Sequence, residues 1–272
     1  MAGWNGGGQW TIIPMTYQQD ITLTSMTRGG DGFRDGSAAQ AQFNGAVALA
    51  LMDDGSILVV DQSNHSIRLI SANGKHVRTI AGSAVQGHQD GPAAQARFHY
   101  PYAAVVLSGG RILIADWGNH CIRMISADLQ QVSTVAGDGT QGHRDGAAAQ
   151  ATFRFPCGLA VLPDGRVLVS QDHCIRVLSA DLQQVTTVAG TGERGHQDGP
   201  GAEARFFFPK GMLVLPDNRV LVADSWNERI RVLSADLQEV MTVAEEWAGA
   251  VIIGILAHAP AVCAVTNPAV NS

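Results

Sequence analysis

The stretch ILIADWGNHCIRMI, residues 112–125, is the part of the sequence that decides the fold. Related stretches occur three more times, as ILVVDQSNHSIRLI (57–70), VLVSQDHCIRVL (167–178) and VLVADSWNERIRVL (220–233). Each stretch holds two short runs rich in Val, Ile and Leu that flank a few polar residues, which is typical of two strands joined by a loop. Because a run such as ILIAD is apolar on successive residues, it suits a sheet that is covered on both faces.

Each of these stretches lies inside a longer repeat. Asp-Gly pairs that begin at Asp35, Asp90, Asp145 and Asp198 are separated by 55, 55 and 53 residues. An apolar segment and a tight turn such as PDGR (163–166) precede each stretch, and a segment such as STVAG (133–137) follows it. Each unit therefore predicts four β-strands and no helix. Four such units indicate an all-β fold, a β-propeller built of four-stranded antiparallel blades.

The two ends of the chain contain candidate closing strands. Residues 21–27, ITLTSMT, precede an Asp-Gly loop as the last strand of a blade does, and residues 10–13, WTII, are a second candidate. The C-terminal region holds AVIIGIL (250–256) and AVCAV (261–265). We expect an N-terminal segment (1–28), four blades (29–244), a divergent apolar segment (245–272), and a composite fifth blade formed from both ends. The uncharged residues 247–265 leave open a membrane span or an unpaired end.

Composition narrows the class of protein and of partner. The chain of 272 residues is 46% hydrophobic and 15% charged, which favours a folded, strand-rich domain. Its net charge is -6 and it has only two lysines, so nucleic acid is not the expected partner. The N-terminus lacks the basic start and apolar run of a signal peptide. The four cysteines form no CxxC pair, and we predict an intracellular, cytoplasmic location.

The order of short motifs within the unit resembles the long form of the NHL repeat. The motifs are G-x-x-x-G-H-x-D-G, then A-R-F-x-x-P, the PDG turn and V-A-D-x-x-N-x-x-I-R, and the similarity covers residues 29–244. The resemblance implies a propeller with one blade per repeat and usually six blades. It also implies a shape related to the NHL domains of tripartite-motif ubiquitin ligases and, more distantly, to gluconolactonase-like hydrolases and peptidyl-amidating lyases. Only four repeats are visible, so the propeller is either shortened or incomplete.

Strand direction predicts which loops share a face. If the strands of each blade are called a to d and alternate in direction, the d–a loops and the b–c loops emerge on one face, called here the loop-rich face. This face contains Trp117 and Trp226, which are candidate anchors for a protein or peptide partner. Acidic residues outnumber basic ones by four in these loops, which argues further against nucleic acid.

Polar residues that recur in every unit are best interpreted as architecture. Arg68, Arg123, Arg176 and Arg231 predict one hydrogen bond per blade, and Asp35, Asp90, Asp145 and Asp198 predict a turn before glycine. His88, His143 and His196 recur in three units, with Phe33 in the fourth place. They are candidate partner-binding residues or, as an alternative, a metal-binding ring around the axis.

The sequence thus predicts a non-catalytic scaffold, without a cofactor, that binds a protein or peptide through the loop-rich face. No nucleophile elbow, P-loop, HExxH or dinucleotide motif is present. The alternative is a metal-dependent hydrolase or lyase that uses the central channel. That interpretation would begin at the shortened loop of the third unit, which contains Gln171, Asp172, His173 and Cys174. A membrane is not an expected partner, and a place within a larger multidomain protein stays open.

Overall fold

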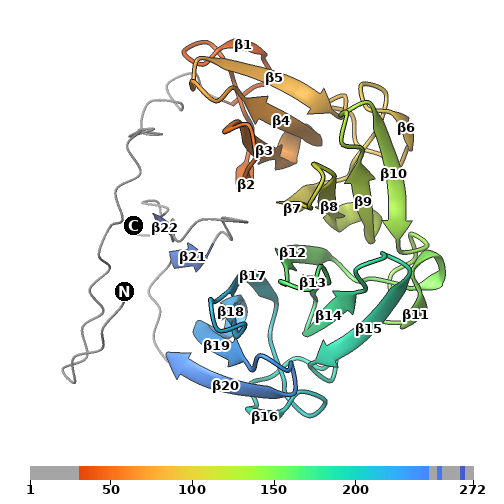
Figure 1. The fold of residues 1–272 in the computed structure, drawn as a ribbon, viewed down its shortest axis with the longest axis vertical. Helices are drawn as coiled ribbons and strands as arrows, with labels where there is room; N and C mark the ends of the chain where they lie inside the picture. The colour runs from red at the N-terminus through yellow and green to blue at the C-terminus, as the bar shows by residue number, and fades with distance from the viewer. Residues whose placement is uncertain (1–30, 245–249, 253–263, 267–272) are drawn as a thin grey trace.

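The protein is an all-β propeller in which four antiparallel sheets surround a common centre (Figure 1). The computed structural model describes residues 31–244, 250–252 and 264–266. Within these residues the helical segments are 3-10 turns of three residues each, as in η3 (Trp117–Asn119) and η5 (Ser225–Asn227). The predicted fold class is confirmed.

Each blade contains the four predicted strands and one short addition at its outer edge. Blade 1 has the strand order β1-β5-β4-β3-β2, with bounds β1 Gly36–Ser37, β2 Ala46–Leu51, β3 Ile57–Asp61, β4 Ser66–Ile70 and β5 His76–Ala81. Blade 2 has the order β6-β10-β9-β8-β7, with bounds β6 Gly91–Pro92, β7 Pro101–Val106, β8 Ile112–Asp116, β9 Cys121–Ile125 and β10 Gln131–Ala136.

The other two blades repeat this order. Blade 3 is β11-β15-β14-β13-β12, with bounds β11 Gly146–Ala147, β12 Pro156–Val161, β13 Val167–Gln171, β14 Cys174–Leu178 and β15 Gln184–Ala189. Blade 4 is β16-β20-β19-β18-β17, with bounds β16 Gly199–Pro200, β17 Pro209–Val214, β18 Val220–Asp224, β19 Arg229–Leu233 and β20 Glu239–Ala244. The glycine of each Asp-Gly pair begins the added two-residue strand, which pairs with the fourth main strand of its own blade.

The turns between the first two strands of each blade need a left-handed backbone. Gly165 in the third blade has φ 85°, and Asn218 takes its place in the fourth with φ 67°. Glycine adopts this region without a Cβ penalty, and asparagine tolerates it better than most residues. These residues reverse the chain tightly and thereby set the pairing of the flanking strands.

The apolar core lies between neighbouring blades. Three clusters of buried side chains join blade 1 to blade 2, blade 2 to blade 3 and blade 3 to blade 4. Phe98, Phe153 and Phe206, from the A-R-F and A-T-F motifs, are fully buried in these clusters. The strands of blades 2 and 3 are apolar on both faces because each of these sheets is covered by a neighbouring blade on either side.

The described part of the chain holds four blades, not the six that the family resemblance implies. β21 (Ala250–Ile252) and β22 (Ala264–Thr266) form a separate antiparallel pair, and β21 lies beside β17. They fall in the predicted closing segments AVIIGIL and AVCAV. The N-terminal candidates, residues 10–13 and 21–27, lie outside the described residues, so the composite fifth blade stays a prediction.

The membrane interpretation of residues 247–265 concerns a stretch that is only partly described. Two pieces of it, β21 and the start of β22, are short strands. Among the residues that the structure describes, none belongs to a helix with the length and apolar character needed to span a bilayer.

Candidate functional site

The two sets of loops predicted to share a face are joined by direct hydrogen bonds. The d–a loops are residues 31–45, 82–100, 137–155 and 190–208, and the b–c loops are residues 62–65, 117–120, 172–173 and 225–228. In blade 2 the Asn119 side chain donates to the Gly87 carbonyl at 2.7 Å. Asn64 and Asn227 make the same bond in blades 1 and 4. Together these loops form the loop-rich face.

A buried arginine organises the loops of each blade. Arg123 is fully buried and lies between two carboxylates, with Nη2 2.6 Å from Asp90 and Nη1 2.9 Å from Asp116. Its guanidinium also donates to the carbonyls of Gln89 and Arg97. Arg68, Arg176 and Arg231 occupy the equivalent places and are also fully buried. One arginine per blade therefore joins the d–a loop to the sheet.

The aspartate of the Asp-Gly pair extends this network to the outer strand. Asp90 accepts hydrogen bonds from the amide and hydroxyl of Thr134 on β10, at 2.9 and 3.2 Å. Burial alone would raise the pKa of Asp90, but the Thr134 amide and the charge of Arg123 outweigh it, so the pKa lies below its usual value. The carboxylate is therefore charged at neutral pH and takes part in a charged hydrogen-bond network.

The third blade departs from this arrangement. Gln171 stands where the other blades have Asp61, Asp116 and Asp224, so Asp145 is the one acidic partner of Arg176 in the described part of the chain. The displaced carboxylate is Asp172, whose side chain is 1% exposed. It lies 3.2 Å from Arg154 Nη1 and 3.4 Å from the Nε2 atoms of His143 and His173. The shortened loop thus gathers one buried acid, two imidazoles and one arginine.

The histidines of the G-H-x-D-G motif do not form a ring around the axis. His88 Nε2 lies 3.0 Å from the Thr134 hydroxyl, and His196 Nε2 lies 2.9 Å from the Thr242 hydroxyl. Both threonines are on outer strands, whereas the axis is lined by the inner strands (Figure 1). His143 contacts Gln171 instead, at 2.9 Å. Among the described residues, no group of three or more His, Cys, Asp or Glu side chains could hold a metal ion. The geometry thus opposes the metal-ring alternative.

The two predicted tryptophans differ in their surroundings. Trp117 is half-buried and stacks on Phe155 of the next blade, with ring centroids 4.4 Å apart. Trp226 is 61% exposed and leans against Phe207 and Phe208 at 5.1 and 5.0 Å. Trp117 therefore contributes to packing between blades, while Trp226 presents most of its surface to solvent.

Three histidines connect neighbouring blades, and the sequence analysis named only His173 among them, as part of the shortened loop. The Nδ1 atoms of His65, His120 and His173 face the backbone amides of Tyr100, Phe155 and Phe208 at 3.1, 3.3 and 3.5 Å. Each bond joins a b–c loop to the last residue of the d–a loop that leads into the next blade. The signal in the sequence is weak, because each histidine precedes a strand and its partner amide is 35 residues away.

The acceptor role of these histidines requires the neutral imidazole. Burial is the main cause that lowers the pKa of His65 and of His120, and nearby positive groups lower it further. The aromatic donors also adopt an uncommon backbone, with φ 50° at Tyr100, 53° at Phe155 and 49° at Phe208. Residues in this region persist where the surrounding structure holds them, and such sites often serve binding.

The same histidines and aromatic residues form two clusters on the loop-rich face. The first cluster extends from His65 through Tyr100 and Trp117 to Phe155. The second contains His173, Phe207, Phe208 and Trp226. Asp172 joins them, because it contacts both Arg154, the neighbour of Phe155, and His173.

The structure changes the predicted charge of this face. The four buried arginines belong to strands, so the sequence-based count of loop residues left them out, yet each contacts loop carbonyls or carboxylates. Each buried guanidinium therefore offsets part of the negative charge that these loops carry.

Comparison with known proteins identifies related chains. The model of the NHL repeat matches residues 98–123, which run from Phe98 of blade 2 to its buried arginine. Protein SUPPRESSOR OF QUENCHING 1, chloroplastic, from Arabidopsis thaliana is 29% identical over 234 residues, which cover 79% of this chain and 22% of that protein. NHL repeat-containing protein 2 from Homo sapiens is 28% identical over 249 residues, which cover 78% of this chain and 34% of that protein.

A solved structure shares the fold at lower identity. An auxiliary nutrient binding protein from Bacteroides ovatus superimposes with a TM-score of 0.55 at 18% identity, over 75% of this chain and 50% of that chain. This likeness concerns the fold alone. The chain spans about a fifth to a third of the length of the curated relatives that it matches.

Proposed function

The chain belongs to the NHL-repeat β-propeller family, and on that premise we propose that it is a non-catalytic scaffold that binds a protein or peptide through its loop-rich face. The observation that carries the proposal is the cluster of Trp226, Phe207 and Phe208. Trp226 is largely exposed, yet its ring rests on two phenylalanines that restrict its motion. An amphipathic ring held in this way is typical of the residues that dominate protein interfaces.

Rigid support for the exposed ring strengthens the proposal. Phe208 is held by the His173 contact to its amide, and the Trp226 amide donates to the Phe207 carbonyl at 3.0 Å. A binding residue whose position is set before the partner arrives loses less conformational entropy on association. The buried arginines add to this rigidity because they fix the d–a loops to the sheets.

Selection of ligands from a random peptide library on the purified protein tests the proposal. Affinity of the selected peptides is then measured by calorimetry for the wild type and for Trp226→Ala. We expect the substitution to weaken binding by about tenfold or more, as truncation of an interface anchor does. Trp117→Ala should have a smaller effect on the same peptides, because that ring faces Phe155.

Met241→Ala is the matched control, since Met241 is 53% exposed but lies on the outer strand β20. Its affinity should stay within about twofold of the wild type. Failure to select any peptide, or equal binding by wild type and Trp226→Ala, would contradict the proposal. Circular dichroism of each variant verifies that the fold is intact.

A further inference from the structure

One position on the inner strands differs in every blade. The second residue of these strands is Val47 in β2, Tyr102 in β7, Cys157 in β12 and Lys210 in β17. Most polar positions of this protein recur from blade to blade because each blade needs them. A position that is different in each blade is not required by the blade, so its residues are free to serve a function.

Three residues of blade 3 hold the backbone around Lys210. The Ser170 hydroxyl donates to the Lys210 carbonyl at 2.7 Å, and the Cys157 thiol donates to the Pro209 carbonyl at 3.2 Å. Burial raises the pKa of Cys157 to about 11, so the thiol keeps its proton and its role as donor. Gly158 permits the close approach, because a Cβ there would lie 1.9 Å from the Lys210 carbonyl oxygen.

The Lys210 side chain extends from β17 toward the ring of Tyr102 on β7. The ammonium nitrogen lies 5.6 Å from the centre of this ring, although the two strands belong to blades 4 and 2. Among the described residues, no carboxylate lies within 4 Å of this ammonium. A half-buried cation without an acidic partner is a ready site for an anionic group.

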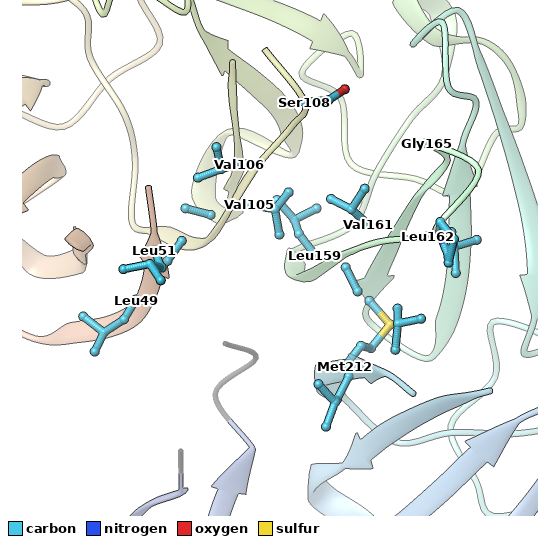
Figure 2. Close-up of a pocket in the computed structure, with 16 residues that line it drawn as sticks. Leu49, Leu51, Val105, Val106, Ser108, Leu159, Val161, Leu162, Gly165 and Met212 are labelled. Carbon is cyan, nitrogen blue, oxygen red and sulfur yellow. The ribbon is translucent and has the colours of Figure 1, made fainter. Parts of the chain in front are cut away.

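The centre of the molecule also contains an apolar cavity of about 570 Å³. Figure 2 shows side chains from all four blades around it, including Leu49, Val105, Leu159 and Met212. Ser108 and Gly165, from the turns opposite the loop-rich face, also line it. The volume falls within the range of small-molecule sites, and such sites are mostly apolar with few polar groups.

Lys210 lies on β17, an inner strand that also lines the cavity. Met212, which lines the cavity, follows Lys210 by two residues on β17, whose register shifts between Pro209 and Met212, so the two Cα atoms are at most about 7 Å apart. A molecule with an acidic head and an apolar body could therefore contact the ammonium with its head while its body fills the cavity. The Tyr102 ring would lie beside the head.

We propose that the central channel binds an amphipathic monocarboxylate, with the carboxylate on Lys210 and the apolar chain in the cavity lined by Leu49, Val105, Leu159 and Met212. This site is separate from the proposed peptide-binding face and does not depend on it. Ionic recognition selects for the acid, and burial of the chain supplies most of the affinity.

The test uses dodecanoate as the probe and the two lysines of the chain as reporters. Purified wild-type protein is acetylated with limiting acetic anhydride, and modification of Lys210 and Lys75 is quantified by mass spectrometry with and without dodecanoate. Lys75 is exposed in the turn between β4 and β5 and serves as the internal control. We expect dodecanoate to reduce the Lys210 to Lys75 ratio by about tenfold at saturation.

Calorimetry then separates the two parts of the site. Lys210→Met should weaken dodecanoate binding by about tenfold or more, whereas Lys75→Met should leave it unchanged. Acetate, which lacks the apolar chain, should bind more than about a hundredfold more weakly than dodecanoate. Val105→Phe, which adds volume to the cavity wall, should weaken dodecanoate without changing the reactivity of Lys210 in the free protein.

Three outcomes would overturn the proposal. They are a labelling ratio that dodecanoate does not change, equal affinity of the wild type and Lys210→Met, and absence of any heat of binding at millimolar dodecanoate. Retained peptide binding in the Lys210→Met variant would show that the loop-rich face is intact, so failure of the channel site and failure of the peptide site are distinguishable.

Discussion

Replacement of Arg123 by methionine should destabilise the fold more than the same replacement of Arg176. Both guanidinium groups are fully buried, and both arginines follow an isoleucine in the third strand of a blade. They differ in what each would leave behind. Loss of Arg123 leaves the Asp116 carboxylate without its positive partner, and this carboxylate has no exposure to solvent. In blade 3 the residue at the position of Asp116 is the uncharged Gln171, so loss of Arg176 leaves no such buried charge.

The magnitudes follow from these partners. Removal of one member of a buried ion pair typically costs about 3–5 kcal/mol, because the remaining charge is neither solvated nor paired. Asp116 keeps hydrogen bonds from the His99 amide and the Asn119 side chain, both at 2.8 Å, and burial already raises its pKa to about 6. Protonation therefore limits the cost, and we expect a loss near the lower end, about 3 kcal/mol.

The Arg176 variant loses milder interactions. Arg176 donates to the carbonyls of Thr152 and Arg144 and to Asp145, whose side chain is 42% exposed. Water can solvate Asp145 after the substitution, so the expected loss is about 1–2 kcal/mol. The difference of about 1–2 kcal/mol between the variants is a measurable part of a total stability of about 5–15 kcal/mol.

Equilibrium unfolding in urea, followed by circular dichroism, measures both losses. A double variant that adds Asp116→Asn to Arg123→Met should recover about 1 kcal/mol of stability, because the asparagine amide carries no charge that would be left unpaired. Equal destabilisation by the two single variants, or a larger loss for Arg176→Met, would refute the reasoning. So would a double variant no more stable than Arg123→Met.

Three further predictions concern pH, close packing and backbone strain. Burial lowers the pKa of His120, so the unfolded chain binds more protons as the pH falls through about 6.5, and stability decreases there. The side chain of His120→Gln can still accept a hydrogen bond from the Phe155 amide, but it does not titrate. Urea unfolding at pH 7.5 and 5.5 should therefore show a smaller loss of stability at the lower pH for this variant than for the wild type. Equal losses of stability would contradict this prediction. Gly158→Ala should destabilise the fold by about 1–3 kcal/mol or more, because the added Cβ would overlap the Lys210 carbonyl. The loss is measured as a lower Tm. An unchanged Tm would show that β12 and β17 can move apart at no cost. Asn218→Val should destabilise the fold by about 1–2 kcal/mol, because φ at this position is 67° and valine disfavours a left-handed backbone. Asn218→Gly should stay within about 0.5 kcal/mol of the wild type in the same urea unfolding assay. Equal stability of the two variants would contradict a left-handed backbone at this turn.

The repeat carried enough local information to predict the blades. Strand runs such as ILIAD, the Asp-Gly turns and the interval near 55 residues each depend on neighbours in the sequence. Strand alternation then predicted that the d–a and b–c loops share a face, and bonds such as that of Asn119 to Gly87 join them. The short outer strand at each Asp-Gly pair escaped prediction because two residues carry no periodicity.

The candidate site was less accessible to such reasoning. His88 and His65 look alike in the sequence, since each lies in a loop next to other polar residues. Only the fold places His88 against Thr134 on an outer strand and His65 against the backbone of the next blade. The partners of the loop aspartates escaped prediction for a similar reason, because the arginines that pair with them lie within strands.

The amino-acid sequence by itself determined the all-β class, the number of visible repeats and the sides on which the loops emerge, because these depend on periods and turns read along the chain. The tertiary structure alone decided which tryptophan is exposed, which histidines join the blades and that Lys210 lies near Tyr102 across the centre. The contacts of His65 with Tyr100 and of Lys210 with Tyr102 join residues 35 to about 110 positions apart, and only the arrangement of the blades around an axis brings them together.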